Sequence, residues 1–433
     1  MDTLERIILF ETIRDDEVAA RLAELLHDTT TDSNLIKATR EAFYTTQRVL
    51  LNNLGSGKIS GNYLQDHICR LIAESENVFS RMSEDGVFKD LDSGISAADL
   101  KKTLTPEAET VILLAANEIS LISEVYRFDF EIFHKVTDDY DIAAVPVSNA
   151  SKLSNRELIH KALTRDDSLA AAVTLSDFYH SYGSGVFQAA SALTAEDSGL
   201  VPVPNIDDIS VDDLIGYESQ KRMLSDNLEI LLSGLPANNM LLYGDSGTGK
   251  SSTVKALLNK YASNGLKMIS VAKNKLDLLP GILEQIANRG MKFIIFIDDL
   301  SFEENEHEYK AFKSIIEGRV APRPRNAVFI VTSNRKNIVK EVWRDREDQD
   351  DVRRRDNIQE KRSLADRFGI TLVFSAPDKT EYLEIVRGIA KKSGLSMPDE
   401  ELVNEALKWE IRHGGRSGRA ARQFVDYMVG IKR

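Results

Sequence analysis

The residues with the clearest chemical meaning form a glycine-rich segment at positions 244–251, whose pattern is G-x-x-x-x-G-K-S. A short apolar run at 240–243 precedes it, and a helical pattern at 252–258 follows it. This order of strand, loop and helix is the setting in which such a loop binds phosphate. Glycines let successive backbone N–H groups turn toward one anion, and the helix adds the positive end of its dipole. We therefore predict a nucleoside triphosphate site here rather than an ordinary glycine-rich turn.

Two side chains of this segment extend the prediction to a metal ion. The Lys250 ammonium would reach the β- and γ-phosphates, and the Ser251 hydroxyl would ligate Mg²⁺. The loop would otherwise contribute mainly backbone N–H donors. The residues predicted to bind ATP in this segment are Gly244, Asp245, Ser246, Gly247, Thr248, Gly249, Lys250, Ser251 and Ser252.

A pair of acidic residues, Asp298 and Asp299, follows the apolar run at 293–297. A continuous apolar run indicates a strand that is buried on both faces, as in a parallel sheet. Ligands bind outside the carboxyl ends of such strands. We predict that Asp298 holds the Mg²⁺ and that Asp299 accepts a proton from the attacking water. The alternative is that the two acids only cap the next helix.

The elements that must position these residues alternate along the second half of the chain. Further strands are expected at 266–271, 327–332 and 370–374, and the polar residue Asn334 follows the second of these. Asn334 would orient the lytic water or the γ-phosphate. Residues 378–433 have a helical pattern. Strands that alternate with helices and then a small helical segment indicate a three-layer α/β core with an appended lid.

Composition limits the class of protein. The chain has 433 residues, 42% of them apolar, which suffices for two or three domains. No apolar stretch is long enough to span a bilayer, and the N-terminus lacks the pattern of a secretory signal. A single cysteine, Cys69, excludes an internal disulfide and makes a structural zinc cluster implausible. We expect a soluble cytoplasmic protein that does not bind membranes.

Charge divides the chain. Residues 1–200 carry a formal charge of −15, and residues 201–433 carry +2. The acidic half has a mostly helical pattern, and its aromatic run at 177–193 would be a packed core or a docking surface. We predict a helical partner-binding domain at 1–193, a linker at 194–209, an α/β core at 210–377 and a lid at 378–433. The alternative is that the acidity only keeps a helical domain soluble.

With these motifs the chain resembles the AAA+ ATPases over residues 205–433, and most of all the bacterial family labelled domain of unknown function 815. The likeness is carried by residues 244–251, 298–302, 317–318, 332–335 and 365–369. The resemblance implies an AAA+ P-loop NTPase core with a parallel sheet of strand order 5-1-4-3-2. It also implies an ATP site at the edge between neighbouring subunits of a homo-oligomer, as a ring or arc.

The resemblance also implies roles for residues outside the two motifs. Ile215 and Gly216 would flank the adenine, and Asn334 would be the sensor at the end of strand four. Arg419 would be the sensor on the lid, with Arg416 as the alternative. Arg367 would be an arginine finger in the neighbouring subunit's site, or else a helix-terminal arginine that pairs with a local aspartate.

One position departs from the AAA+ pattern, because Asp299 stands where a glutamate usually follows the metal-binding aspartate. Its carboxylate is one methylene shorter, and a small misplacement can slow a reaction about 100-fold. A slow nucleotide switch is therefore an alternative to a motor.

Two arginine-rich segments, at 319–325 and 343–362, would contact nucleic acid or a ring neighbour, although their mixed charge is more typical of a solvated loop. We favour a Mg²⁺-dependent, oligomeric ATPase whose N-terminal domain engages a protein client. One alternative is an ATP-regulated scaffold that does not hydrolyse ATP. Another is a DNA-associated ATPase of the helicase-loader or clamp-loader kind, which would use Arg323, Arg325 or the arginines at 353–355.

Overall fold

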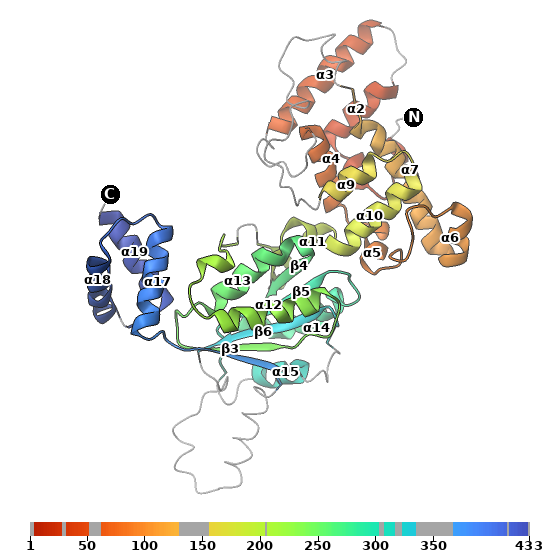
Figure 1. Cartoon of the computed structure of the whole chain (residues 1–433). Helices are drawn as coiled ribbons and strands as arrows, with labels where there is room; N and C mark the ends of the chain where they lie inside the picture. Colours follow the sequence, from red (N-terminus) through yellow and green to blue (C-terminus); the bar gives the residue numbers. More distant parts are fainter. Residues whose placement is uncertain are drawn as a thin grey trace. The chain divides into compact units, whose positions relative to one another are not determined.

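The computed structural model describes nine segments of the chain. They are residues 4–27, 32–51, 62–129, 156–203, 206–302, 307–316, 323–334, 367–413 and 415–431. The chain divides into two compact units. The helical unit contains Met1–Ala190 and the short segment Asn288–Met291, and the sheet unit contains Ser191–Ala287 and Lys292–Arg433. Figure 1 shows the helices and strands of both units.

The helical unit is built of helices in the residues that the structure describes, in agreement with the predicted helical N-terminal half. Its elements are η1 (Leu4–Arg6), α1 (Glu11–Arg14), α2 (Glu17–His27), α3 (Asp32–Leu51), α4 (Tyr63–Glu74), α5 (Val78–Glu84), α6 (Ala97–Thr103), α7 (Pro106–Tyr126), α9 (Arg156–Leu163), α10 (Ser168–Tyr182) and α11 (Gly185–Ala189). Side-chain caps fix several helix starts, such as the capping box of Asn62 before α4 and the Asp167 carboxylate before α10.

The aromatic side chains of the run at 177–193 lie in this unit, to which the run belongs up to Ala190. Phe178 and Tyr179 are fully buried, and Phe187 is buried as well. Helix α10 packs against α5, α7 and α9. The run is thus a packed core rather than a docking surface.

The segment Asn288–Met291 is held in the helical unit by a buried acid. Ser184 donates two hydrogen bonds to Oε1 of Glu84, from its backbone N–H and its hydroxyl, both over 2.6 Å. The second carboxylate oxygen pairs with Arg289, whose guanidinium lies 4.5 Å from the ring centroid of Phe187. A buried charge is tolerated when it is paired and hydrogen-bonded in this way.

The sheet unit has a sheet that contains seven strands among its described residues. They are β1 (Ala192–Glu196), β2 (Gly199–Pro202), β3 (Met240–Gly244), β4 (Leu266–Ser270), β5 (Lys292–Ile297), β6 (Ala327–Ser333) and β7 (Ile370–Phe374), in the spatial order β2-β1-β4-β5-β6-β3-β7. Strands β3 to β7 are all parallel. Numbered one to five along the chain, they lie in the order 5-1-4-3-2, so the expected AAA+ fold class is confirmed.

Two strands lie where the sequence predicted a linker. Strand β1 pairs with β4 in parallel, and β2 returns antiparallel to β1. Ala192, Leu193 and Ala195 are buried, and Glu196 at the end of the strand is exposed. The pattern is only five residues long, too short to stand out beside the prolines and glycine of this segment.

Helices on both faces make the expected three-layer core. One face of the sheet buries Met240 and Leu242 against α12 (Glu218–Leu232) and α13 (Lys250–Tyr261). On the opposite face, Phe329 contacts Phe312 of α15 (His307–Ile316). The unit also contains η2 (Val211–Asp213), η3 (Ala262–Asn264), η4 (Lys273–Leu278) and α14 (Leu279–Ile286).

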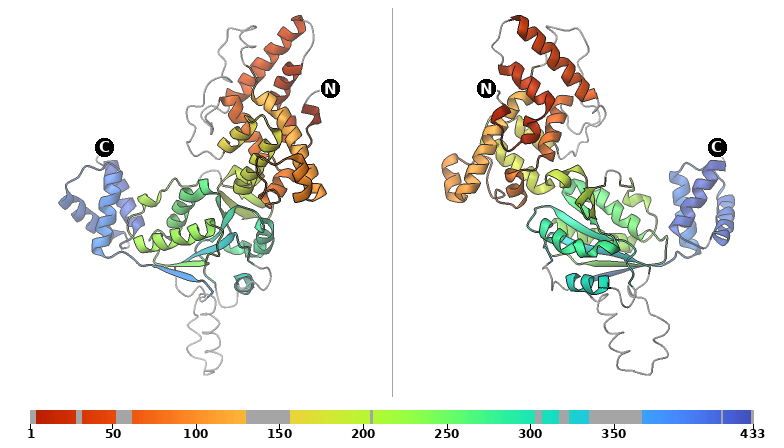
Figure 2. Two further views of the ribbon diagram at one scale, coloured as in Figure 1. Left: turned by 45° about the vertical axis from the view of Figure 1, so that its right-hand side comes forward. Right: turned by 180° about the vertical axis from the view of Figure 1, so that it is seen from behind.

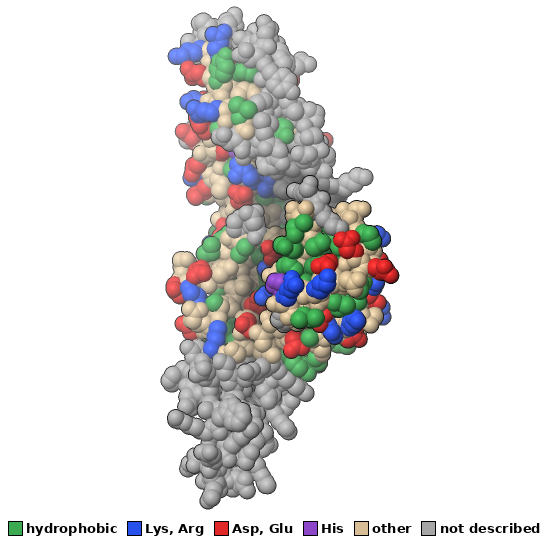
Figure 3. Space-filling view, turned by 90° about the vertical axis from the view of Figure 1, so that its left-hand side faces the viewer, with side chains coloured by type: hydrophobic (Ala, Val, Ile, Leu, Met, Phe, Trp, Pro, Cys, Tyr) green, Lys and Arg blue, Asp and Glu red, His purple; other side chains and the backbone are tan. Residues whose placement is uncertain are grey.

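The lid follows β7 and has a core of its own. It consists of α17 (Lys379–Lys392), α18 (Asp399–Arg412) and α19 (Gly418–Ile431), which are drawn in blue in Figure 2. Tyr382, Phe424 and Val425 are buried between these helices. The outer surface mixes charged and apolar side chains (Figure 3), and Ile411 is 82% exposed. Among the described helices, none is both long and apolar enough to cross a membrane.

Candidate nucleotide-binding site

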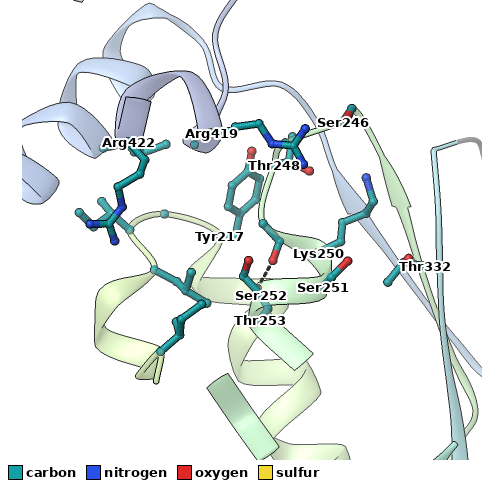
Figure 4. A pocket seen from close by; sticks show the side chains of 18 of the residues that line it. Tyr217, Ser246, Thr248, Lys250, Ser251, Ser252, Thr253, Thr332, Arg419 and Arg422 are labelled. Atoms are coloured by element: carbon teal, nitrogen blue, oxygen red, sulfur yellow. Dashed lines mark hydrogen bonds between the residues drawn. The ribbon is translucent and has the colours of Figure 1, made fainter. Parts of the chain in front are cut away.

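The glycine-rich loop connects β3 to α13, as the sequence predicts. Helix α13 begins at Lys250, and Gly249 before it has a φ of 91°, a left-handed conformation that glycine adopts without strain. The first turn of the helix therefore opens toward a cavity of about 570 Å³ (Figure 4). The lining comes from the loop, strand ends β5 and β6, the segment after η2, and the lid.

Three hydrogen bonds hold the Lys250 ammonium at the cavity. Its Nζ donates to the carbonyl oxygens of Gly244 and Asp245, each over 2.8 Å, and to Oδ1 of Asn334 over 3.2 Å. Burial lowers the pKa of Lys250, while the nearby carboxylates of Asp299, Asp245 and Asp298 act in the opposite direction. Neutral carbonyls are weaker partners for an ammonium than phosphate oxygens, so a triphosphate can displace them.

A hydroxyl and a carboxylate meet where the metal ion is predicted. The Ser251 hydroxyl donates to Oδ1 of Asp298 over 2.6 Å, and the Thr332 hydroxyl donates to the same oxygen over 2.5 Å. Hard oxygen ligands of this kind suit Mg²⁺. The residues present therefore fit the predicted ion, with Thr332 fixing the orientation of the carboxylate. The sequence marks Thr332 as a polar residue at the end of its strand but assigns it no role in the site.

Asp299 has an unusual backbone. Its φ is 51°, a left-handed conformation that is uncommon outside glycine. Two hydrogen bonds hold it: its N–H donates to Oγ1 of Thr332 over 2.8 Å, and Oδ1 accepts from Nδ2 of Asn334 over 2.7 Å. Asn334 thus links the Lys250 ammonium to the Asp299 carboxylate. The carboxylate is exposed toward the cavity, where a water molecule can approach it.

The far end of the cavity is lined by residues 214–217. Ile215 and Gly216, which were expected to flank the adenine, line the cavity together with Ile385 and Ile389 of α17. These apolar side chains offer the surface that a purine ring needs. Ile215 also packs against α17 so closely that a Cβ at Gly388 would lie 2.0 Å from its Cδ1.

The lid supplies two arginines that line the cavity. The guanidinium of Arg419 points toward Ser246 and Thr248 in Figure 4, and that of Arg422 points away from them. Arg416 bonds Glu410 over 2.7 Å and is not part of the lining. Of the two sensor candidates, therefore, Arg419 lies at the cavity. Arg422 was missed in the sequence, because only its spacing of three residues from Arg419 on a helix brings it to the same face.

Several predicted residues lie elsewhere. Gly244 and Asp245 do not line the cavity: Gly244 abuts the backbone of Phe374, and the Asp245 carboxylate turns away to the N–H of Ala376. Arg367 is exposed in the turn before β7 and does not line the cavity of its own chain.

The arginine-rich segments lie largely outside the described residues. Those at 353–355 fall there entirely, as do positions 317–319 and 366. Arg323 is half-buried, and it donates to Oδ1 of Asn239 over 2.8 Å and to the carbonyl of Ala237 over 2.9 Å. Its guanidinium therefore stabilises the fold of its own chain. Arg325 is exposed.

Comparison with known proteins gives one family and a set of distant structures. The model of a family described as "Protein of unknown function (DUF815)" matches residues 187–432. No curated protein matches the chain. Solved structures of the Thermotoga maritima Holliday junction branch migration motor RuvB are similar at 20% identity and a TM-score of 0.36, and a point variant of the same protein is similar at 21% with the same score. These matches cover 52% of this chain and 66% of RuvB, just under two thirds of its length.

Proposed function

The chain belongs to the family of proteins of unknown function DUF815, and from this premise and the site we propose that it is a Mg²⁺-dependent ATPase of the AAA+ fold. A fold alone does not establish an activity, so the proposal is supported by the site itself. The observation that carries it is the convergence of Lys250, Ser251, Asp298, Asp299 and Asn334 on one cavity, linked by hydrogen bonds of 2.6–3.2 Å.

In this proposal the loop binds the triphosphate through its backbone N–H groups and Lys250. Lys250 exchanges its two carbonyl acceptors for oxygens of the β- and γ-phosphates. Ser251 and Asp298 would hold Mg²⁺. When bound, that ion neutralises charge on the phosphates. Ile215 and Gly216 would contact the adenine through the apolar end of the cavity.

Asp299 is the proposed general base. Its carboxylate would accept a proton from the attacking water, and Asn334 would orient that water or the γ-phosphate. Because Asn334 already bonds Asp299, the carboxylate is held in one orientation before the nucleotide arrives. Asn334 donates to Oδ1, so the second oxygen of the carboxylate, Oδ2, can take the proton of the water. A slow turnover is consistent with an aspartate in place of the usual glutamate.

Completion of the site by a second subunit is part of the proposal. Arg419 would contact the γ-phosphate from the lid of the same chain, and Arg367 would contact it from a neighbouring chain. Arg367 does not line the cavity of its own chain, which supports action on another copy. Exposed apolar side chains on the lid, among them Ile411, Tyr427 and Ile431, offer surface for a ring or arc.

The helical unit would engage a protein client in the cytoplasm. Its half of the chain is strongly acidic, which disfavours nucleic acid and favours a partner with basic surface. The engagement of Arg323 by Asn239 and Ala237 also weakens the DNA-associated alternative. ATP turnover would then be coupled to remodelling or regulation of the client.

Phosphate release by the purified full chain tests the proposal. Mg-ATP should be hydrolysed by the wild type, and Asp299→Asn should bind ATP yet lose at least about 100-fold in kcat. Asp426→Asn, an equal change at an exposed position of α19, should keep wild-type turnover. An ATP-regulated scaffold predicts binding without phosphate release at any protein concentration. This scaffold is the second candidate, because the acid at position 299 is an aspartate, one methylene shorter than the usual glutamate.

A further inference from the structure

Residues 375–377 connect β7 to the lid. This lid connection begins beside the phosphate-binding loop, residues 244–251. Gly244, the last residue of β3, is in register with Phe374, the last residue of β7. A Cβ at Gly244 would lie 2.1 Å from the carbonyl oxygen of Phe374, so the two backbones touch. Only glycine fits this contact, and its φ of 138° also favours glycine. The loop and the lid connection therefore leave the sheet from the same point.

Asp245 ties these two segments together. Its N–H donates to the carbonyl of Phe374 over 3.0 Å, and its Oδ2 accepts from the N–H of Ala376 over 2.7 Å. A carboxylate that accepts from a backbone N–H makes one of the stronger hydrogen bonds in proteins. Asp245 thus binds the first residues after β7, although it is itself part of the phosphate-binding loop.

Tyr217 makes a second tie to the same connection. Its hydroxyl donates to the carbonyl of Ser375 over 2.6 Å, and its ring lies 5.1 Å from that of Phe374, centroid to centroid. The backbone of Tyr217 has a φ of 58°, an uncommon conformation for a bulky residue. The segment that lines the adenine end of the cavity therefore also holds the lid connection.

The phosphate-binding loop touches the far end of the lid as well. The carbonyl of Gly247 accepts from the N–H of Arg419 over 3.2 Å. A Cβ at Gly247 would lie 3.2 Å from Cβ of Arg419 and from Oγ of Ser417, so the start of α19 rests directly on the loop. Residues 245 and 247 of one loop thus contact the segment that enters the lid and the helix that carries Arg419.

We propose that Asp245 and Tyr217 are positioning residues that clamp the lid connection, residues 375–377, to the nucleotide-binding loops and so set the place of Arg419. This inference rests on the proposed ATP binding and adds the residues that would position the lid for it. Because both lid contacts originate in the loop that holds the phosphates, a change in that loop is transmitted to both ends of the lid. Asp245 then acts through Arg419 and does not touch the nucleotide.

The first test uses hydrogen exchange of the nucleotide-free full chain. In Asp245→Ala, the amides at 376 and 417–421 should exchange about tenfold faster, because a charged hydrogen bond of this kind is lost. Asp245→Asn keeps an acceptor oxygen and should stay within about twofold of wild type. The matched control is Asp378→Ala, which removes the cap of α17 and leaves the loop untouched. Unchanged exchange at 417–421 in Asp245→Ala overturns the clamp.

The second test asks whether Asp245 works through Arg419. Asp245→Ala should lower kcat about tenfold and change the ATP Kd less than threefold, and Arg419→Ala should lower kcat to a similar degree. If the clamp acts by positioning Arg419, the double variant should have the same kcat as Arg419→Ala alone. A kcat lowered by the product of the two single losses contradicts the proposal. Tyr217→Phe removes the hydroxyl and keeps the ring, and it should lower kcat less than Asp245→Ala does.

The two proposals fail in distinguishable ways. A wild type that binds no Mg-ATP contradicts the proposed function, while the exchange experiment on the nucleotide-free protein still decides the clamp. A wild type that hydrolyses ATP, with no faster exchange at 376 and 417–421 in Asp245→Ala, contradicts the clamp alone.

Discussion

The side-chain amide of Asn334 donates a hydrogen bond to Oδ1 of Asp299 over 2.7 Å. The oxygen of the same amide accepts from Nζ of Lys250 over 3.2 Å. One residue at the end of β6 therefore links the lysine of the phosphate-binding loop to the acid that follows β5. Strand order explains the arrangement, since β6 lies between β5 and β3 in the sheet.

Replacement of Asn334 tests this link. In Asn334→Ala, the Asp299 carboxylate loses its donor, and kcat for ATP hydrolysis should fall on the order of 10–100-fold. The ATP Kd should change less than about threefold, because Lys250 retains its phosphate partners. Steady-state kinetics and a direct binding measurement separate the two effects. Asn264→Ala, at an exposed position, serves as the control, and an equal loss there would show that the effect is not specific to the site.

The pH dependence of ATP binding reports on Lys250. Burial lowers the pKa of this group in the free protein, and a bound triphosphate stabilises its charged form and raises the pKa. Between the two pKa values, binding must take up a proton, so affinity should fall as pH rises through the lower one. Calorimetry in buffers of different ionisation enthalpy measures the uptake. An absence of proton uptake at any alkaline pH would contradict this prediction, and Lys250→Arg, which stays charged, should show none.

Mixing variants tests whether Arg367 acts on a second copy. Arg367→Ala and Asp299→Asn should each be nearly inactive, because one lacks the finger and the other lacks the base. Mixed protomers contain some interfaces that join an intact Arg367 to an intact Asp299, so part of the activity should return. Specific activity of the wild type should also rise with protein concentration. Failure of every mixing ratio to restore activity would favour action within one chain.

A buried lysine gives a prediction about stability. Lys267 of β4 is 5% exposed, and burial lowers its pKa to about 8. The unfolded chain then binds more protons than the native one between pH 8 and the ordinary lysine pKa, so stability should rise with pH across that window. Lys267→Met should flatten this rise and stabilise the protein at pH 7 by on the order of 1–3 kcal/mol. Denaturant unfolding at several pH values measures the free energy of unfolding. If this free energy rises with pH in Lys267→Met as steeply as in the wild type, the buried lysine is not the cause.

The core of the site was predictable because its signals are short and contiguous. Residues 244–251 and the pair Asp298–Asp299 each follow an apolar strand directly, so their place at a sheet edge follows from the order of elements. What depends on side-chain direction was not predictable. The Asp245 carboxylate faces Ala376 rather than phosphate, and Arg422 joins the lining only through the register of α19.

The hairpin of β1 and β2 shows a second limit of sequence patterns. Strand β1 pairs with β4 and β2 pairs with β1, and these backbone hydrogen bonds leave little trace in residue types. Residue types alone also do not decide between Arg416 and Arg419 as the residue at the cavity. The decision depends on the hydrogen bond of Arg416 to Glu410, six residues earlier in α18.

Calorimetric titration of Mg-ATP into the purified full chain shows whether the loop at 244–251 binds a triphosphate. A triphosphate site at this loop predicts saturable heat with one site per chain for the wild type. It also predicts a loss of affinity of at least about 100-fold in Lys250→Ala, which removes the charged partner of the phosphates. A folded wild type that gives no binding heat, or a Lys250→Ala variant that binds as tightly as the wild type, would contradict it.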